Sequence, residues 1–87
     1  MIVDDVPQVR RGLAVFLELW DEYLLVGEAA NGEHAVEMTD ILQPDLVLMD
    51  TAMPVMDGVT AKRLINEKYP HIHVVLKTDE GYPGISK

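Results

Sequence analysis

Four short apolar runs alternate with three amphipathic segments along this chain, and this alternation limits the folds that it can adopt. The runs lie at residues 1–3, 24–29, 46–49 and 72–76. Continuous apolar runs of this length are typical of strands that helices cover on both faces. The alternating order predicts an α/β fold, in which a doubly wound parallel sheet of four strands is connected by three helices through right-handed crossovers.

Proline, asparagine and aspartate mark where the three amphipathic segments begin and end. Pro7 suits the first turn of a helix, because its missing N–H needs no partner there. Asn31 precedes a second helical pattern, which stops at Pro44 because the residue before a proline resists the helical region. Asp57 is placed to cap a third helix over residues 58–69, and Pro70 ends that helix. We therefore interpret Asp57 as a helix cap and not as a residue that takes part in the chemistry of the site.

Acidic side chains follow two of the predicted strands. Asp4 and Asp5 come directly after the first run, and Asp50 comes directly after the third. If these strands are parallel neighbours, the three carboxylates meet at one edge of the sheet, where open α/β sheets bind their ligands. Their mutual repulsion then favours a bound divalent cation, and hard oxygen ligands favour Mg²⁺. The alternative is that these residues form solvated turns, which also favour aspartate.

The composition limits what else the chain can do. It has 87 residues, no cysteine and a formal net charge of −8, which describe one small acidic domain without disulfides or thiolate metal sites. No apolar run reaches membrane-spanning length and the start lacks the pattern of a signal peptide, so we expect a cytoplasmic protein without a membrane partner. Acidic residues outnumber basic ones by 15 to 7, so we expect no direct contact of this segment with nucleic acid.

Four motifs of the chain resemble those of the receiver domain of two-component response regulators, and they occur in that family's order. They are IVDD at residues 2–5 followed by Pro7, VGEAANGE at 26–33, PDLVLMD at 44–50 and MPVMDG at 53–58. The sequences of these motifs are most similar to those of regulators with a LuxR-type DNA-binding domain. The resemblance implies a flavodoxin-like receiver fold over residues 1–78, and it leaves residues 79–87 as a loop or frayed tail.

The resemblance also implies a function. Asp50 would accept a phosphoryl group from a sensor histidine kinase, and the receiver would control a DNA-binding output domain that these 87 residues do not include. Mg²⁺ would be bound by Asp5 and Asp50 directly, by Asp4 through water, and by the main-chain carbonyl of Ala52. The adjoining structural loop would contain Pro54, Asp57 and Gly58. No enzymatic activity is expected beyond self-phosphorylation and autodephosphorylation.

The carboxyl-terminal part departs from the family pattern. A receiver of this family has five strands, so we expect the present chain to be a receiver truncated after its fourth strand. In the family, a Ser or Thr ends the fourth strand and a Lys ends the fifth, and both face the phosphoryl group. Counting from Pro70 assigns Thr78 to the first of these roles. An alternative alignment assumes a deletion, so that residues 76–80 correspond to the end of the family's fifth strand. Lys77 then takes the role of the lysine that faces the phosphoryl group.

Truncation would leave the fourth strand as an exposed edge beside uncovered apolar sheet surface, so we expect the chain to self-associate. Two other functions stay open. The chain could be an interaction module that works without phosphorylation. A metal-dependent phosphohydrolase is disfavoured, because enzymes that resemble the haloacid dehalogenase group need a second Asp two residues after the nucleophile, where this chain has Ala52.

Overall fold

Short parallel strands form the sheet of the computed structural model, which describes residues 1–85. The strands are β1 (Ile2–Val3), β2 (Glu28–Ala29), β3 (Leu46–Met49) and β4 (His73–Leu76), and they lie in the order β2-β1-β3-β4. Every pair of neighbouring strands is parallel. The predicted parallel sheet of four strands is therefore confirmed.

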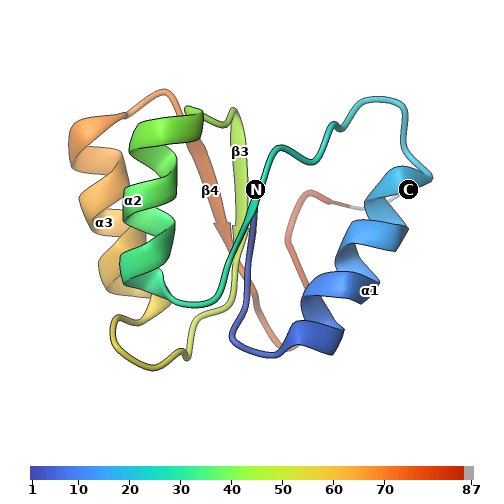
Figure 1. Ribbon diagram of the computed structural model, residues 1–87, viewed down its shortest axis with the longest axis horizontal. Coiled ribbons are helices and arrows are strands. Elements are labelled where there is room, and N and C mark those ends of the chain that lie inside the picture. Colours follow the sequence, from blue (N-terminus) through green and yellow to red (C-terminus); the bar gives the residue numbers. More distant parts are fainter. Residues whose placement is uncertain (86–87) are drawn as a thin grey trace.

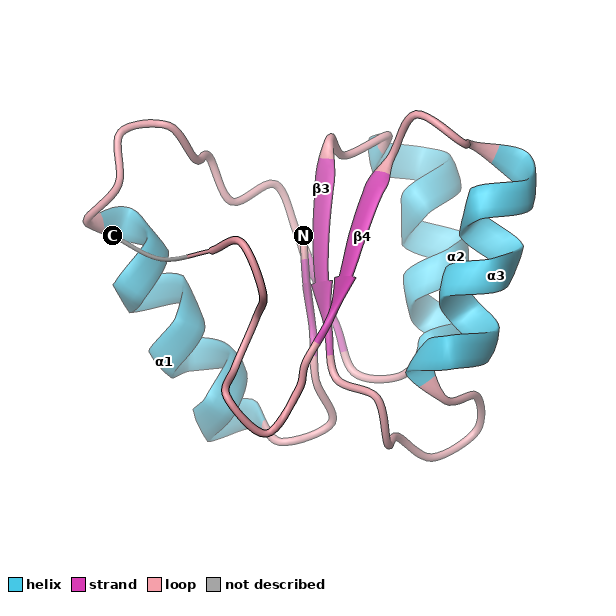
Figure 2. Cartoon of the chain, turned by 180° about the vertical axis from the view of Figure 1, so that it is seen from behind, coloured by secondary structure: helices cyan, strands magenta, loops and turns pink. Residues whose placement is uncertain are grey.

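Each connection between the strands carries one helix. α1 (Pro7–Glu18) lies on one face of the sheet, whereas α2 (Gly32–Leu42) and α3 (Gly58–Lys68) lie side by side on the other (Figures 1 and 2). This is the doubly wound arrangement that the alternating sequence pattern predicts. Among the described residues, no helix has the length and apolarity that crossing a membrane requires.

The sheet separates two apolar clusters, because successive residues of a strand point to opposite faces. Val3 and Val47 belong to the cluster that packs against α2 and α3. Ile2 and Leu48 belong to the cluster on the side of α1. All four side chains are at most 1% exposed. The two central strands are thus covered on both faces, which explains why their sequences are continuous apolar runs.

Side-chain caps begin two of the helices at the residues that the sequence indicates. The Asn31 side chain accepts a hydrogen bond from the amide of His34 at 2.8 Å, and it caps α2. The Asp57 carboxylate accepts one from the amide of Thr60 at 2.7 Å, and it caps α3. This bond stabilises the ionised carboxylate, so it lowers the pKa of Asp57 below its usual value.

The second strand is much shorter than the sequence predicts. An apolar run over residues 24–29 indicated a strand of six residues, but only Glu28–Ala29 pairs with the sheet. The physical reason is that β1, which is the only neighbour of β2 within residues 1–85, offers only Ile2–Val3 for pairing. Leu24 is consequently 85% exposed.

Residues 79–85 cover part of the sheet, so the expectation of uncovered apolar surface beside β4 is not met. Thr78 and Gly81 form an isolated antiparallel bridge, after which Tyr82 and Ile85 pack against the cluster on the side of α1. Val75 of β4 is 6% exposed as a result. β4 itself remains at the edge of the sheet. Residues 86–87, the end of the predicted tail, lie outside the described residues.

Gly58 supplies a test of how closely the loop after β3 packs on that strand. A Cβ at Gly58 would overlap the carbonyl oxygen of Asp50, whereas a Cβ at Gly12 in α1 would meet nothing within 4 Å. We expect Gly58→Ala to lower the free energy of unfolding by about 1–3 kcal/mol, because backbone atoms must move apart. Gly12→Ala is the matched control and should raise it by about 0.5–1 kcal/mol, because alanine favours a helix interior.

Urea denaturation followed by circular dichroism measures both effects. A neutral or stabilising result for Gly58→Ala would show that the loop does not hold its backbone against the end of β3.

Candidate functional site

The carboxyl ends of β1 and β3 bring three carboxylates together. Val3 pairs with Met49, so Asp4 and Asp50 leave the sheet at the same level. Asp5 follows directly after Asp4, and one oxygen atom from each of the three aspartates lies within 4.8 Å of the others. The structure therefore brings Asp4, Asp5 and Asp50 to one place, as the parallel arrangement of the strands predicts.

The three aspartates differ in burial and in what holds them. Asp4 is 2% exposed, and its Oδ1 accepts a hydrogen bond from the amide of Val6 at 2.9 Å. Asp50 is partly buried, and its Oδ1 accepts one from the amide of Thr51 at 2.8 Å. Asp5 is exposed. The cluster thus has a fixed inner part and one side open to solvent, from which a cation or a substrate can approach.

The loop between β3 and α3 is tied to the sheet on one side and to α2 on the other. The amide of Gly58 donates to the carbonyl oxygen of Thr51 at 2.8 Å, and the amide of Gly32 donates to the carbonyl oxygen of Met56 at 3.0 Å. Inside the loop, the amide of Met56 donates to the carbonyl oxygen of Pro54 at 2.8 Å.

These bonds leave the Ala52 carbonyl without a hydrogen-bond donor in the described part of the chain. Ala52 lies two residues after Asp50 and is exposed. Its carbonyl oxygen is therefore available for a ligand. Val55, at the tip of the same loop, has a φ of 71°, in the left-handed region that non-glycine residues seldom adopt.

Arg10 supports the site, and sequence analysis did not single it out. Its Nη1 donates a hydrogen bond to the carbonyl oxygen of Asp4 at 2.6 Å, and its Nε lies 3.4 Å from Oε1 of Glu28. The guanidinium thereby links the turn after β1 to Glu28 of β2. No spacing rule would have revealed this contact, because a long side chain reaches a main-chain atom six residues away.

Lys77 lies beside the end of β3. Its amide donates to the carbonyl oxygen of Met49 at 2.9 Å, so it continues the pairing of β4 with β3 by one residue. Its carbonyl oxygen accepts a hydrogen bond from the hydroxyl of Thr51 at 2.9 Å. The register therefore places Lys77 level with Asp50.

Thr78 is exposed and lies one residue further along. Its hydroxyl donates to the carbonyl oxygen of Gly81 at 3.1 Å and accepts from the amide of Glu80 at 3.2 Å. Lys77 and Thr78 are thus the first and second residues after β4, but the Thr78 hydroxyl is engaged in the turn that follows.

Tyr82 is a second residue that sequence analysis did not single out. Its hydroxyl is buried and has no hydrogen-bond partner within residues 1–85. Burial raises the pKa of the Tyr82 phenol far above its usual range, and the charges of Asp4 and Asp50 act in the same direction. The phenol therefore stays neutral beside the acidic cluster.

The donor set of the cluster fits a hard divalent cation. Three carboxylate oxygens within 4.8 Å of one another are the ligands that Mg²⁺ accepts, and the open side at Asp5 leaves room for the waters that it retains. These 87 residues contain no cysteine, so none of them offers a thiolate ligand. The chemistry that this arrangement can support is the binding and transfer of an anionic group, such as a phosphoryl group, at a carboxylate.

Known proteins resemble this chain in sequence. The sequence profile of the response regulator receiver domain matches residues 1–83. The transcriptional regulatory protein YdfI of Bacillus subtilis (strain 168) is 45% identical over 78 residues, which are 90% of this chain and 37% of YdfI. The chain therefore spans little more than a third of that relative.

Two solved structures have the same fold. A LuxR-family two-component response regulator from Aurantimonas sp. SI85-9A1 has a TM-score of 0.83 at 33% identity, over 87% of this chain and 54% of that one. A chain of the CheX–CheY complex with BeF₃ and magnesium from Borrelia burgdorferi has a TM-score of 0.80 at 31% identity, over 86% and 57% respectively. With the profile match over residues 1–83, these likenesses show that the chain belongs to the response regulator receiver domain family of two-component systems.

Proposed function

We propose that Asp50 is the residue of this receiver domain that accepts the phosphoryl group. Receiver domains of this family are phosphoryl acceptors, and Asp50 directly follows the central strand β3 at the edge where the carboxylates meet. The hydrogen bond from the amide of Thr51 holds its Oδ1. Of the three aspartates, Asp50 combines a fixed position with partial access to solvent, which is what a nucleophile needs.

The transfer itself requires little covalent chemistry from the protein. A carboxylate oxygen of Asp50 forms a P–O bond while the P–N bond of the kinase's phosphohistidine breaks. The leaving imidazole keeps the electron pair of that bond and takes up a proton. The protein contributes mainly by placing the carboxylate in line with the phosphorus atom and by neutralising charge.

Magnesium is the cofactor that we propose for this step. Asp5 and Asp50 would bind it directly, Asp4 would bind it through water, and the free carbonyl of Ala52 would add a neutral oxygen ligand. Held by these residues, Mg²⁺ would supply positive charge that offsets the negative charge of the phosphoryl oxygens. The Borrelia complex that shares this fold contains magnesium and BeF₃, which supports the assignment.

We also propose a biological setting. The chain acts in the cytoplasm, its partner is a sensor histidine kinase, and residues 1–78 form the receiver part of a transcription regulator whose DNA contacts belong to another domain. The name of YdfI supports such a role, and the net charge of −8 argues against direct DNA contact by this segment. The exposed edge of β4 is a surface for self-association. No catalytic activity is proposed beyond the chemistry at Asp50.

Replacement of Asp50 tests its role as the acceptor. Incubation with a small phosphodonor such as acetyl phosphate and Mg²⁺ should add one phosphoryl group to the intact chain, as measured by mass spectrometry. Asp50→Asn should abolish the adduct, because an amide is not a nucleophile for this step. Asp57→Asn is the matched control, and it should remain phosphorylated because asparagine also caps helices well.

An adduct that persists in Asp50→Asn would overturn the assignment of the acceptor. If the unchanged protein, folded by circular dichroism, takes no phosphoryl group, the chain acts as an interaction module that does not depend on phosphorylation.

Replacement of Thr78 and of Lys77 distinguishes which of the two residues contacts the phosphoryl group. The two hydrogen bonds of the Thr78 hydroxyl are long and solvent-exposed, so exchanging them for a phosphoryl oxygen costs little. We propose that Thr78 makes this exchange. Thr78→Ala should then slow phosphorylation by the small donor about tenfold, whereas Thr78→Ser should not. Lys77→Ala should change the rate less than about twofold. The rates are measured by the same mass assay over time. If Lys77→Ala slows phosphorylation about tenfold and Thr78→Ala has little effect, the contact belongs to Lys77.

A further inference from the structure

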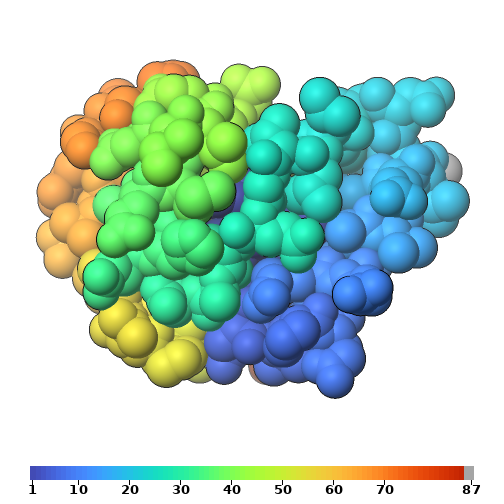
Figure 3. All heavy atoms as spheres, viewed as in Figure 1, coloured from blue at the N-terminus to red at the C-terminus, as the bar shows by residue number. Residues whose placement is uncertain are grey.

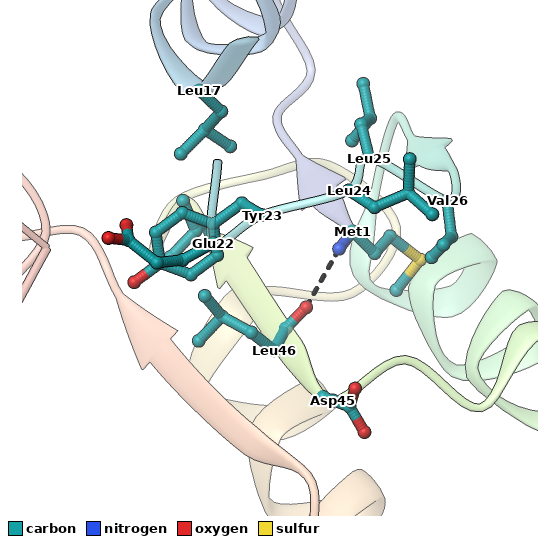
Figure 4. Close-up of a pocket in the computed structure, with 10 residues that line it drawn as sticks. Met1, Leu17, Glu22, Tyr23, Leu24, Leu25, Val26, Asp45 and Leu46 are labelled. Atoms are coloured by element: carbon teal, nitrogen blue, oxygen red, sulfur yellow. Dashed lines mark hydrogen bonds between the residues drawn. The ribbon is translucent and has the colours of Figure 1, made fainter. Parts of the chain in front are cut away.

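The two ends of the parallel sheet differ in what they hold. The amino ends of β1 and β3 border a pocket of about 320 Å³ with mostly apolar walls, where the Met1 ammonium bonds to the carbonyl oxygen of Leu46 (Figure 4). At the carboxyl ends, the dark blue segment after β1 and the yellow loop after β3 lie next to each other on the surface (Figure 3). Chemistry at Asp50 therefore depends on contacts at the second of these ends.

Thr51 follows Asp50 directly, and each of its three hydrogen-bonding groups joins a different part of this end. Its amide donates to Oδ1 of Asp50 at 2.8 Å. Its carbonyl oxygen accepts from the amide of Gly58, at the start of α3, at 2.8 Å. Its hydroxyl donates to the carbonyl oxygen of Lys77, just after β4, at 2.9 Å. Thr51 thus connects Asp50 both to α3 and to the turn that follows β4.

The bond from the Thr51 hydroxyl fixes the base of the turn that carries Thr78. The amide of Lys77 donates to the carbonyl oxygen of Met49 at 2.9 Å, and the carbonyl oxygen of Lys77 accepts from Thr51, so the backbone of Lys77 is held on both sides. The Lys77 carbonyl and the Thr78 amide belong to one planar peptide group. The bond to Thr51 therefore also sets the direction in which the chain enters Thr78.

Beyond this base, the turn is held less firmly. The bond between Thr51 and Lys77 is partly buried, whereas the two bonds of the Thr78 hydroxyl are exposed and longer. The backbones of Thr78 and Gly81 exchange hydrogen bonds of 2.7 and 3.0 Å, and the chain then passes to the side of α1 (Figure 2). The Thr78 side chain can thus change partners while the Lys77 carbonyl stays in place.

We propose that Thr51 is a positioning residue, which holds the Lys77 carbonyl so that the Thr78 hydroxyl can reach a phosphoryl group on Asp50. This inference rests on the function proposed above for Asp50 and Thr78. The Thr51 side chain acts through Thr78 and not on the phosphoryl group itself. A fixed base limits the orientations that Thr78 must search, and correct orientation before the transition state raises the rate. Lys77 then contributes its main chain, which Lys77→Ala leaves intact.

Replacement of Thr51 in two backgrounds tests this role. Thr51→Val keeps the shape of the side chain and removes the donor to Lys77. With acetyl phosphate and Mg²⁺, we expect the phosphorylation rate, followed by intact mass, to fall about fivefold, and Thr51→Ser should restore it to within about twofold. In the background of Thr78→Ala, Thr51→Val should slow the reaction by less than about twofold, because the residue through which it acts is gone.

Hydrogen exchange of the ¹⁵N-labelled, unphosphorylated chain gives a readout that does not involve activity. In Thr51→Val, exchange should speed up at least about threefold at the amides of Thr78 and Gly81, because their bridge starts from the released Lys77 carbonyl. The amide of His34, which the Asn31 side chain holds at the start of α2, is the control and should exchange at an unchanged rate.

Equal slowing by Thr51→Val with and without Thr78 would overturn the inference, because Thr51 would then act on Asp50 independently of Thr78. Unchanged phosphorylation in Thr51→Val, full-rate phosphorylation in Thr78→Ala, or unchanged exchange at Thr78 and Gly81 would also overturn it. In each of these cases an adduct that depends on Asp50 still forms. Failure of the proposed function is distinct, because the adduct would then be missing from the unchanged chain or would persist in Asp50→Asn.

Discussion

The parallel pairing of β1 with β3 is the contact on which the rest of the site depends. Val3 pairs with Met49, and the amide of Asp50 donates to the carbonyl oxygen of Val3 at 2.9 Å. A register slip of one residue would reverse the face of every side chain in a strand, so it would separate Asp4 from Asp50. The buried side chains of Ile2 and Leu48 oppose such a slip because they would move out of their cluster. Packing of the core thus determines the position of the carboxylates.

That position has an energetic cost. At a separation of 4.8 Å, two unit charges repel each other by roughly 1–3 kcal/mol, for an effective dielectric constant between that of water and about 20. The hydrogen bonds from Val6 to Asp4 and from Thr51 to Asp50 offset part of this repulsion, and the solvent at Asp5 screens part of it. The fold therefore maintains a cluster that a divalent cation would stabilise, and removal of the cation would leave the repulsion in place.

Much of the fold and the acidic cluster could be predicted from sequence, because both follow from local patterns. The alternating runs predict the sheet, and the positions of Asp4 and Asp50 directly after two of these runs predict the cluster. The length of β2 could not be predicted, since it depends on how far β1 extends as a partner. Arg10 and Tyr82 also escaped prediction. Arg10 acts through a main-chain carbonyl, and Tyr82 enters the core from a segment without periodicity, so neither leaves a sequence pattern.

The central claim is that Asp4, Asp5 and Asp50 act as one cation site at the carboxyl edge of the sheet. Paramagnetic broadening of the ¹⁵N-labelled chain by Mn²⁺ tests it most directly, because Mn²⁺ accepts the same oxygen ligands as Mg²⁺ and broadens only nearby amide signals. The account predicts that substoichiometric Mn²⁺ broadens the amides of residues 4–6 and 50–52 and that excess Mg²⁺ restores them. Broadening spread over the other surface carboxylates, or centred away from these two strand ends, would contradict it.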